Sequence, residues 1–564
     1  MAAVFSVGKA GETAVKLVLF AFALALSVQN GLSGFTFDSD PLYYGGYMVA
    51  NGLFPYIDWG ASYSTLPVLI EGGLMRLLGA GWHVTVLHAG LCNALYTVLA
   101  FILFRQFGLG WVSAVAYAAG SAVIYYAPIG YGTPDKPSFL FLMVALVLQG
   151  MAMRTTRPRM IAGLYAGVAL AGVASLFAKL NPSVLYIVPL FAMFLGAGGS
   201  RHLPALAGMA LAVLLLAAGA AVVEIRHPGF LSELFYYAVR LPLVAGSERM
   251  GGEGGFAYTK LADYTRYPTF NLLYALMVAG GVMLWLRREV LSAPGMYRAL
   301  VLPVVLGVSF WAITVFHISH IAQPWPAHVT LVLPGVALLH AALAAGLRSL
   351  APRRNEAMEV ALKLLAVVLL VYTAFDAKEY QRVVGKRRAI FDLELDQGAM
   401  SARGAVGIEA FRYLRWIPWA GDPGLDGEIR DVVAAMNSVP GNVFVAGMPN
   451  HYYVFAGKAP LLPTYVVLAG HTSPSEGTPE EARLIARFGQ NLQTADVRHV
   501  VMNRRSAEGP GRAFLASRYV CKITGFGTRA VLAELCGNHQ PDYARLTPIL
   551  YRLIPRQAGE PSLD

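Results

Sequence analysis

Long apolar blocks constrain this chain more than any other feature of its sequence. From the N-terminus to about Phe375, apolar residues fall in blocks of roughly 18–25 residues, the length that a helix needs to cross the hydrocarbon core of a bilayer. Charged residues make up only 14% of the 564 residues, against about 25% in soluble proteins. The sequence therefore predicts an α-helical polytopic membrane protein.

About eleven of these blocks are candidate transmembrane helices. They are residues 14–33, 83–104, 109–127, 137–153, 160–178, 183–199, 204–224, 269–286, 299–316, 325–347 and 358–375. The first block has no small-residue cleavage site leading into a soluble domain, so we expect an uncleaved span. We expect a transmembrane domain over 1–375, with long loops at 34–82 and 225–268, and a second domain over 376–564.

Arginine placement predicts the orientation of the spans. Alternate gaps between the apolar blocks carry most of the arginines, and the positive-inside rule makes those gaps cytoplasmic. These arginines are Arg105, Arg154, Arg157, Arg159, Arg201, Arg287, Arg288, Arg298, Arg348, Arg353 and Arg354. The gaps of the other phase, and everything after Phe375, are then extracytoplasmic, as in a multi-pass protein of a bacterial inner membrane. The net charge of +11 reflects this topology, so we expect no nucleic-acid partner.

The region after Phe375 has the pattern of a small α/β domain. Strands are expected at Val443–Ala446, Thr464–Leu468 and Val497–Met502, and helices at Gly427–Met436 and Thr478–Gln493. Two cysteines, Cys521 and Cys536, lie in this region, where an oxidising compartment would permit a disulfide; two buried thiols are the alternative. His451, Tyr452 and Tyr453 could contact a glycan, or could be surface or packing residues.

Aspartates in the first outer gap are the candidate catalytic residues. Asp38 and Asp40 follow the first span directly, and Asp58 lies further along the same gap. A carboxylate at a membrane boundary can deprotonate an acceptor hydroxyl, or hold a divalent cation such as Mg²⁺ or Mn²⁺ against a departing phosphate. A helix cap or a turn is the alternative for one of the pair Asp38 and Asp40, and both could also be solvated.

The next outer gaps add a carboxylate and two lysines. Asp135 and Lys136 precede the fourth block, and Lys179 ends the fifth. Asp135 could join the first-gap aspartates as a second carboxylate of an acceptor or metal site, or could cap the helix that follows. The two lysines could bind a lipid phosphate as point charges, although Lys179 could also snorkel to the interface.

Further phosphate-binding and sugar-binding candidates lie in the remaining outer gaps. Arg240 and Arg266 depart from the positive-inside rule, as a phosphate-binding surface would require, although long loops cross regardless of charge. His317 and His320 have no nearby cysteine or carboxylate in sequence to complete a zinc site, so hydrogen bonds to phosphate or sugar suit them better. The tyrosines at 43, 44 and 63 could stack on sugar rings, or could belong to an interfacial aromatic belt.

The order of these motifs resembles the GT-C superfamily of integral-membrane glycosyltransferases, which includes protein O-mannosyltransferases and the aminoarabinose transferase of lipid A. Residues 38–67, DSDPLYYGGYMVANGLFPYIDWGASYSTLP, resemble the first outer loop of that family. The acidic second loop at Asp135, the lysine at Lys179 and a histidine-containing loop before a late span continue the match. The resemblance covers the membrane half, and the C-terminal region matches only the family habit of carrying an outer α/β domain.

The resemblance implies a polyprenyl-phosphate-linked sugar as donor and a first-loop aspartate as catalytic base. The acidic pair of the family is often adjacent, whereas Ser39 separates Asp38 from Asp40 here, so the choice between them stays open. The acceptor would be a glycan, a lipid or a protein at the outer face of the bilayer. The alternatives are a polytopic transporter or flippase, whose charges should lie deep within paired spans, and a glycan polymerase or ligase.

Overall fold

The structure is a computed structural model of the chain. It describes residues 9–32, 40–61, 65–127, 129–133, 135–241, 243, 268–286, 294–318, 330–350, 355–383, 408–411, 425–461, 477–536 and 541–554.

The chain forms two compact units. The first, called the helical unit here, comprises Met1–Gly31, Val86–Val222 and Phe256–Leu393; the second, the mixed unit, comprises Leu32–Thr85, Val223–Gly255 and Glu394–Asp564. The contacts therefore group most of the two long outer loops with the C-terminal region. The sequence instead predicted that both loops belong to the transmembrane domain 1–375. That domain division stays a prediction.

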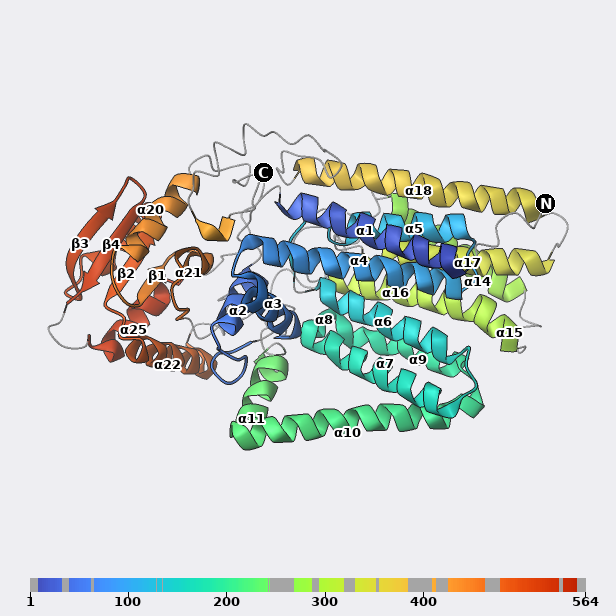
Figure 1. The fold of residues 1–564 in the computed structure, drawn as a ribbon, viewed down its shortest axis with the longest axis horizontal. Helices are drawn as coiled ribbons and strands as arrows, with labels where there is room; N and C mark the ends of the chain where they lie inside the picture. The colour runs from blue at the N-terminus through green and yellow to red at the C-terminus, as the bar shows by residue number, and fades with distance from the viewer. Residues whose placement is uncertain are drawn as a thin grey trace. The chain divides into compact units, whose positions relative to one another are not determined.

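The helical unit is built from long apolar helices that run along roughly the same axis (Figure 1). They are α1 (Lys9–Leu32), α4 (Trp82–Gln106), α5 (Trp111–Tyr125), α6 (Lys136–Ala152), α7 (Pro158–Ala178), α10 (His202–Arg226), α14 (Pro268–Leu286), α16 (Leu302–Ile318), α17 (Val332–Leu350) and α18 (Asn355–Val383). Two shorter helices, α8 (Leu180–Ser183) and α9 (Ile187–Gly196), follow α7 in the chain. Short turns η2 (Val184–Tyr186), η3 (Gly199–Arg201), α15 (Pro294–Met296) and η6 (Tyr297–Val301) connect or extend them.

Among the described residues, five helical segments are long and apolar enough to cross a membrane. They are Ala10–Leu32, Trp82–Gln106, Pro158–Ala178, Gly199–Arg226 and Tyr297–His317. Shorter apolar helices occupy Trp111–Tyr125, Lys136–Ala152, Leu180–Gly196, Phe270–Leu286, Val332–Arg348 and Val360–Phe375. Each predicted block thus contains an apolar helix, which confirms the polytopic helical class, while the count of eleven spans stays a prediction.

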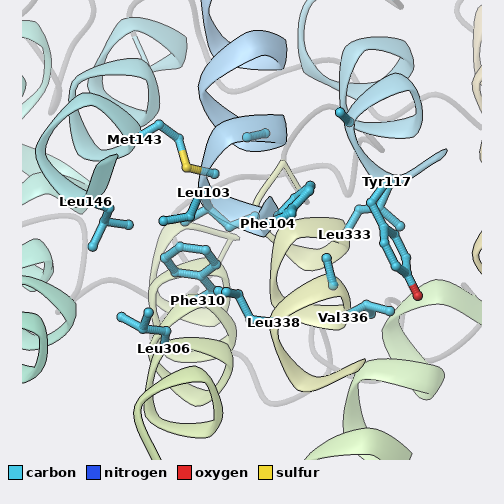
Figure 2. Close-up of a cluster of buried hydrophobic side chains, with 14 of the residues drawn as sticks. Leu103, Phe104, Tyr117, Met143, Leu146, Leu306, Phe310, Leu333, Val336 and Leu338 are labelled. Atoms are coloured by element: carbon cyan, nitrogen blue, oxygen red, sulfur yellow. The ribbon is translucent and has the colours of Figure 1, made fainter. Parts of the chain in front are cut away.

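The core of the helical unit is a cluster of interlocking aromatic and aliphatic side chains. Figure 2 shows side chains of α4, α5, α6, α16 and α17 pointing toward one another, with Phe104 and Phe310 near the centre. Both phenylalanines are fully buried. Helix pairs far apart in sequence, α5 with α18 and α14 with α17, also lie in contact. This packing holds the ends of helices from distant parts of the chain at fixed positions.

The mixed unit contains a four-stranded sheet of order β1-β2-β4-β3. The strands are β1 (Val443–Ala446), β2 (His499–Asn503), β3 (Val520–Phe526) and β4 (Ala530–Leu535), with only β1 and β2 parallel. Every residue of β1 is buried, because α20 (Leu425–Asn437), α22 (Pro479–Thr494) and α25 (Tyr543–Arg552) cover the sheet. The α/β prediction is confirmed for β1, β2, α20 and α22, and the strand predicted at Thr464–Leu468 lies outside the described residues.

A tight helical hairpin from the first outer loop belongs to the same unit. Helices α2 (Asp40–Ala50) and α3 (Thr65–Leu78) pack closely because glycines line their contact. A Cβ atom at Gly46 would lie 2.4 Å from Cγ of Glu71, and one at Gly72 would lie 2.8 Å from the carbonyl oxygen of Gly46. The hairpin is further closed by Arg76, whose guanidinium donates to the carbonyl of Val49 at 2.6 Å.

Candidate functional site

Asp135 and His317 form a buried pair in the helical unit. His317, at the end of α16, places Nε2 3.3 Å from Oδ2 of Asp135, which directly precedes α6. Both side chains are buried. The carboxylate of Asp135 does not cap α6; instead its backbone carbonyl accepts a hydrogen bond from Oγ of Ser138 at 2.6 Å. The side chain of Asp135 therefore does not have the helix-capping role that the sequence offered as an alternative.

Lys136 is a buried residue next to this pair, and its ammonium group has defined contacts. Its Nζ donates to Oγ1 of Thr330 at 2.6 Å and lies 5.6 Å from the centre of the Tyr125 ring. The hydroxyl of Tyr125 in turn donates to the carbonyl of Lys136, and Tyr96 stacks on Tyr125 at 4.1 Å. A fully buried ammonium with these fixed contacts acts as a rigid positive charge beside the carboxylate.

Electrostatics keep Asp135 ionised despite its burial. Burial alone would raise the pKa of its carboxyl, but the hydrogen bond from His317 and the positive charges of Lys179 and Lys136 hold that pKa well below its usual range. The site therefore contains a permanent carboxylate surrounded by cationic or protonatable groups.

Lys179 approaches the cluster from the end of α7. Its backbone leaves the helix in an extended conformation, with its N–H bonded to the carbonyl of Ser175. The side chain is half-buried, unlike that of Lys136. Of the two lysines, Lys179 is therefore the better placed to meet a ligand from solution or from the lipid.

Aromatic side chains also contact the residues of this cluster. Phe139 contacts His317 edge to face at 5.5 Å, and the hydroxyl of Tyr186 lies 3.0 Å from Oγ of Ser138. Desolvation by such rings strengthens the charge interactions next to them. The cluster thus combines a carboxylate, an imidazole and two ammonium groups, which can bind an anion and exchange protons with a hydroxyl.

The described candidates of the first outer loop have structural contacts in the mixed unit. Asp58 is exposed, and its Oδ2 accepts a hydrogen bond from the backbone N–H of Phe54 at 2.7 Å. This bond closes the turn that holds Tyr56 at a φ of +68°. Asp58 therefore stabilises a turn, and its predicted acceptor or metal role stays a prediction.

Tyr43 and Tyr44 are fully buried against the C-terminal part of the same unit. Tyr43 packs on Trp82 at 5.6 Å and on His451 at 5.5 Å, while Tyr44 packs on Tyr453 at 5.9 Å. Helix α21 (His451–Ala456) supplies His451 and Tyr453. The packing role is thus the observed one for His451 and Tyr453, and sugar contact by Tyr43 or Tyr44 stays a prediction.

Arg240 pairs with the C-terminal region of the mixed unit. Its guanidinium lies 3.2 Å from Oε1 of Glu480 on α22, with 60% of the Arg240 side chain exposed. A parallel bond joins Arg483 of α22 to Glu233 of α11 (Phe230–Phe235). Arg240 therefore has a carboxylate partner already, which lowers its availability for phosphate.

Several predicted residues lie outside the described part of the chain. They are Asp38, Tyr63, Arg266 and His320. Asp40 is the first residue of α2, and its side chain is likewise not described. Among the residues that the structure does describe, no group of three or more His, Cys, Asp and Glu side chains could hold a metal ion. The predicted metal site needs the side chains of Asp38 and Asp40, which are not described, so that prediction is untested.

The sequence did not point to Thr330, Ser138 or Tyr186 as members of the cluster. Thr330 lies inside the predicted block 325–347, just before α17 (Val332–Leu350), and nothing in its local sequence marks it. Ser138 and Tyr186 lie inside apolar blocks, where small hydroxyl groups and tyrosines are common, so only the folded chain identifies them.

The predicted disulfide is present between Cys521 on β3 and Cys536 after β4. It ties the two antiparallel strands at the outer edge of the sheet. The remaining cysteine, Cys92, is buried in α4 as a free thiol.

Comparisons with known proteins identify similar solved structures only. No family model matches the chain, and no curated protein matches it either. The chain is similar to ArnT from Cupriavidus metallidurans in the apo state, with 15% identity and a TM-score of 0.47 over 92% of this chain and 97% of that chain. It is similar to ArnT from the same organism bound to undecaprenyl phosphate, with 16% identity and a TM-score of 0.47 over 93% of this chain and 98% of that chain. At these values the likeness decides nothing about activity, which is argued below from this chain's own residues.

Proposed function

We propose that this protein is a membrane glycosyltransferase of the GT-C type. It transfers a sugar from a polyprenyl-phosphate-linked donor to a glycan, lipid or protein acceptor on the extracytoplasmic side. The observation that carries the proposal is the meeting of Asp135, His317, Lys136 and Lys179 at the ends of helices that are far apart in sequence.

The charges of this cluster suit the chemistry of a departing phosphate. In the transfer, the acceptor oxygen attacks the anomeric carbon, the bond from that carbon to the donor phosphate oxygen breaks, and polyprenyl phosphate leaves with its negative charge. A cation near that oxygen stabilises the developing charge. Lys179 is the half-buried ammonium that can take this role, and Lys136 adds a second, fully buried positive charge that acts on Asp135.

The acceptor proton needs a separate base. We assign it to Asp38 or Asp40, at the start of the loop whose sequence, residues 38–67, resembles the first outer loop of the GT-C superfamily. Either carboxylate can accept the proton as the new bond forms. A divalent cation held by Asp38, Asp40 and Asp135 is the alternative arrangement.

The location of the charged groups supports an extracytoplasmic site. Asp135, Lys179 and His317 all belong to the gaps or helix ends opposite to those that carry Arg105, Arg154 and Arg201. The Cys521–Cys536 disulfide is what an oxidising compartment permits for the C-terminal region. A transporter would instead be expected to have charges deep within its spans.

A donor screen on membranes tests the proposal. Membranes that contain the full chain are incubated with radiolabelled polyprenyl-phosphate hexoses and pentoses, and label is followed into lipid, glycan and protein fractions. Transfer from at least one donor, absent in membranes without the protein, is expected, and the donor panel also identifies the sugar class. Translocation of a labelled lipid across proteoliposomes without transfer would instead favour the flippase alternative.

A further inference from the structure

The turn between α6 and α7 forms a cavity at the end of the helical unit opposite to the Asp135 cluster. The cavity measures about 400 Å³ and is lined by Met151, Arg154, Thr155, Thr156, Arg157 and Met160. All six residues belong to the two helix ends and the turn that joins them. The cavity is thus independent of the proposed transferase site.

Hydrogen bonds to backbone carbonyls hold the walls of this cavity in place. Arg154 donates to the carbonyl of Gln106 at 2.8 Å, and Arg201 donates to the carbonyl of Thr155 at 3.0 Å. The N–H of Arg157 is bonded to Oγ1 of Thr155 at 3.3 Å. The turn is therefore fixed from two neighbouring helix ends.

Within the described part of the chain, no carboxylate forms an ion pair with the arginines of this cavity. Between Val86 and Val222 the sequence contains a single acidic residue, Asp135, and it is held at the other helix ends. Among the described residues, Glu12 of α1 is the carboxylate close enough to act on Arg154, and it forms its ion pair with Lys16 at 2.7 Å. Neither Arg154 nor Arg157 forms an ion pair with any described residue.

Apolar side chains flank these cations. Met151 and Met160 expose 40% and 45% of their surfaces beside the arginines, and α7 is one of the helices long enough to cross a membrane. A mixed site of this kind, with cations toward water and thioether chains toward the bilayer, matches the level at which lipid headgroups lie.

We propose that this cavity binds the headgroup phosphate of an anionic phospholipid of the cytoplasmic leaflet. Arg154 and Arg157 pair with the phosphate, and the two methionines contact the first carbons of the acyl chains. Charge complementarity favours this occupant, because that leaflet supplies anionic lipid next to the turn, while no described carboxylate forms an ion pair with Arg154 or Arg157.

Lipid retention by matched variants tests the proposal. The full chain is purified in detergent, mixed with phosphatidylglycerol or phosphatidylcholine, and the retained lipid is measured by native mass spectrometry. We expect phosphatidylglycerol to be preferred, and each of Arg154→Gln and Arg157→Gln to weaken its retention by about five-fold, since a cation at this surface contributes about 1 kcal/mol. Arg157→Gln is the cleaner variant, because the Arg157 guanidinium has no hydrogen bond within the described residues.

Arg348→Gln is the control. Arg348 lies at the end of α17 on the same predicted side of the membrane, and its side chain is exposed, with one bond to the carbonyl of Ala344. Unchanged retention in Arg348→Gln beside reduced retention in Arg157→Gln supports a specific site. Equal retention in all variants, or equal loss in Arg348→Gln, overturns it. Displacement of the lipid by an equal concentration of inorganic phosphate would also overturn it, because the site would then recognise free phosphate.

Discussion

The carboxylate of Asp135 and the imidazole of His317 lie 3.3 Å apart although 182 residues separate them in the sequence. The pair joins the start of α6 to the end of α16, and both side chains are buried. Because removal of one partner takes a hydrogen bond from the other in a buried site, the pair contributes to stability as well as to the chemistry proposed above.

A double-mutant cycle measures this coupling. Asp135→Asn and His317→Gln are each expected to destabilise the protein, and the double variant is expected to lose less than the sum of the two, with an interaction energy of about 1–3 kcal/mol. Unfolding by SDS titration in mixed micelles gives the free energies. The neutral pair Tyr117 and His340, bonded at 3.1 Å, is the matched control with a smaller coupling expected. Additive effects for Asp135 and His317 would show that the two groups do not interact.

Replacement of the first-loop aspartates separates catalysis from binding. Asp38→Asn or Asp40→Asn keeps the size of the side chain and removes its charge, so transfer is expected to fall by roughly 10²–10⁴ for the residue that acts as base. Donor binding should change little, because the base faces the acceptor. Asp496→Asn, at an exposed site in the C-terminal region, is the control for loss of an aspartate charge. Near-full transfer in single and double variants at Asp38, Asp40 and Asp135 would show the proposed active site to be wrong.

Lys179 and Arg240 are expected to differ in their effect on donor binding. Lys179→Met removes a cation from beside Asp135 and should weaken donor affinity by about ten-fold or more, the range for a hydrogen bond to a charged group. Arg240→Met breaks an exposed ion pair with Glu480 and should change affinity by less than about five-fold. Equilibrium binding of a labelled donor to the purified protein gives both values, and a larger effect for Arg240 would move the phosphate site to the mixed unit.

Reporter fusions test the orientation that these assignments require. Alkaline phosphatase fused after Glu379, beyond the last predicted span, is expected to be active in a bacterial host, because that point should be extracytoplasmic. A fusion after Arg348, in a gap predicted to be cytoplasmic, is the inactive control. Activity in the second fusion and not in the first would invert the topology and move Asp135 to the cytoplasmic side.

The Cys521–Cys536 disulfide gives a second test of the compartment in which the C-terminal region lies. Replacement of both Cys521 and Cys536 by serine is expected to lower the stability of the C-terminal region by about 3 kcal/mol, because a loop of about 15 residues is released in the unfolded chain. Thermal unfolding of the full chain with and without reductant measures the loss. In intact cells both thiols should resist alkylation until reductant is added; free thiols in the native protein would place them in a reducing compartment.

The sequence was sufficient to select Asp135, Lys136, Lys179 and His317, because charged residues at the ends of apolar spans stand out against their surroundings. It could not pair Asp135 with His317, since that pairing depends on how α6 and α16 both pack against α8 and α9. Nor could it identify Thr330 as the partner of Lys136, because a threonine inside the predicted block 325–347 carries no distinguishing pattern.

Tyr43 and Tyr44 are residues whose burial the sequence did not predict. Tyrosines in an outer loop of a membrane protein suggest ligand contact or an interfacial belt, and both interpretations assume that the loop is open. Burial of these rings depends on α21, which follows about 400 residues later in the chain, and local sequence does not encode which segment covers a loop.

The packing of α2 against α21 determines where the chain can be divided for engineering. The hydroxyl of Tyr47 donates to the carbonyl of Lys458 at 3.1 Å, and Arg487 donates to the carbonyl of Ile57 at 2.9 Å, so residues 40–61 share one interior with the C-terminal region. A chimera that exchanges only residues 376–564 with a homologue would mismatch this interior. A graft that carries the hairpin Asp40–Leu78 together with the C-terminal region would preserve it, so the two segments are best exchanged as a single module.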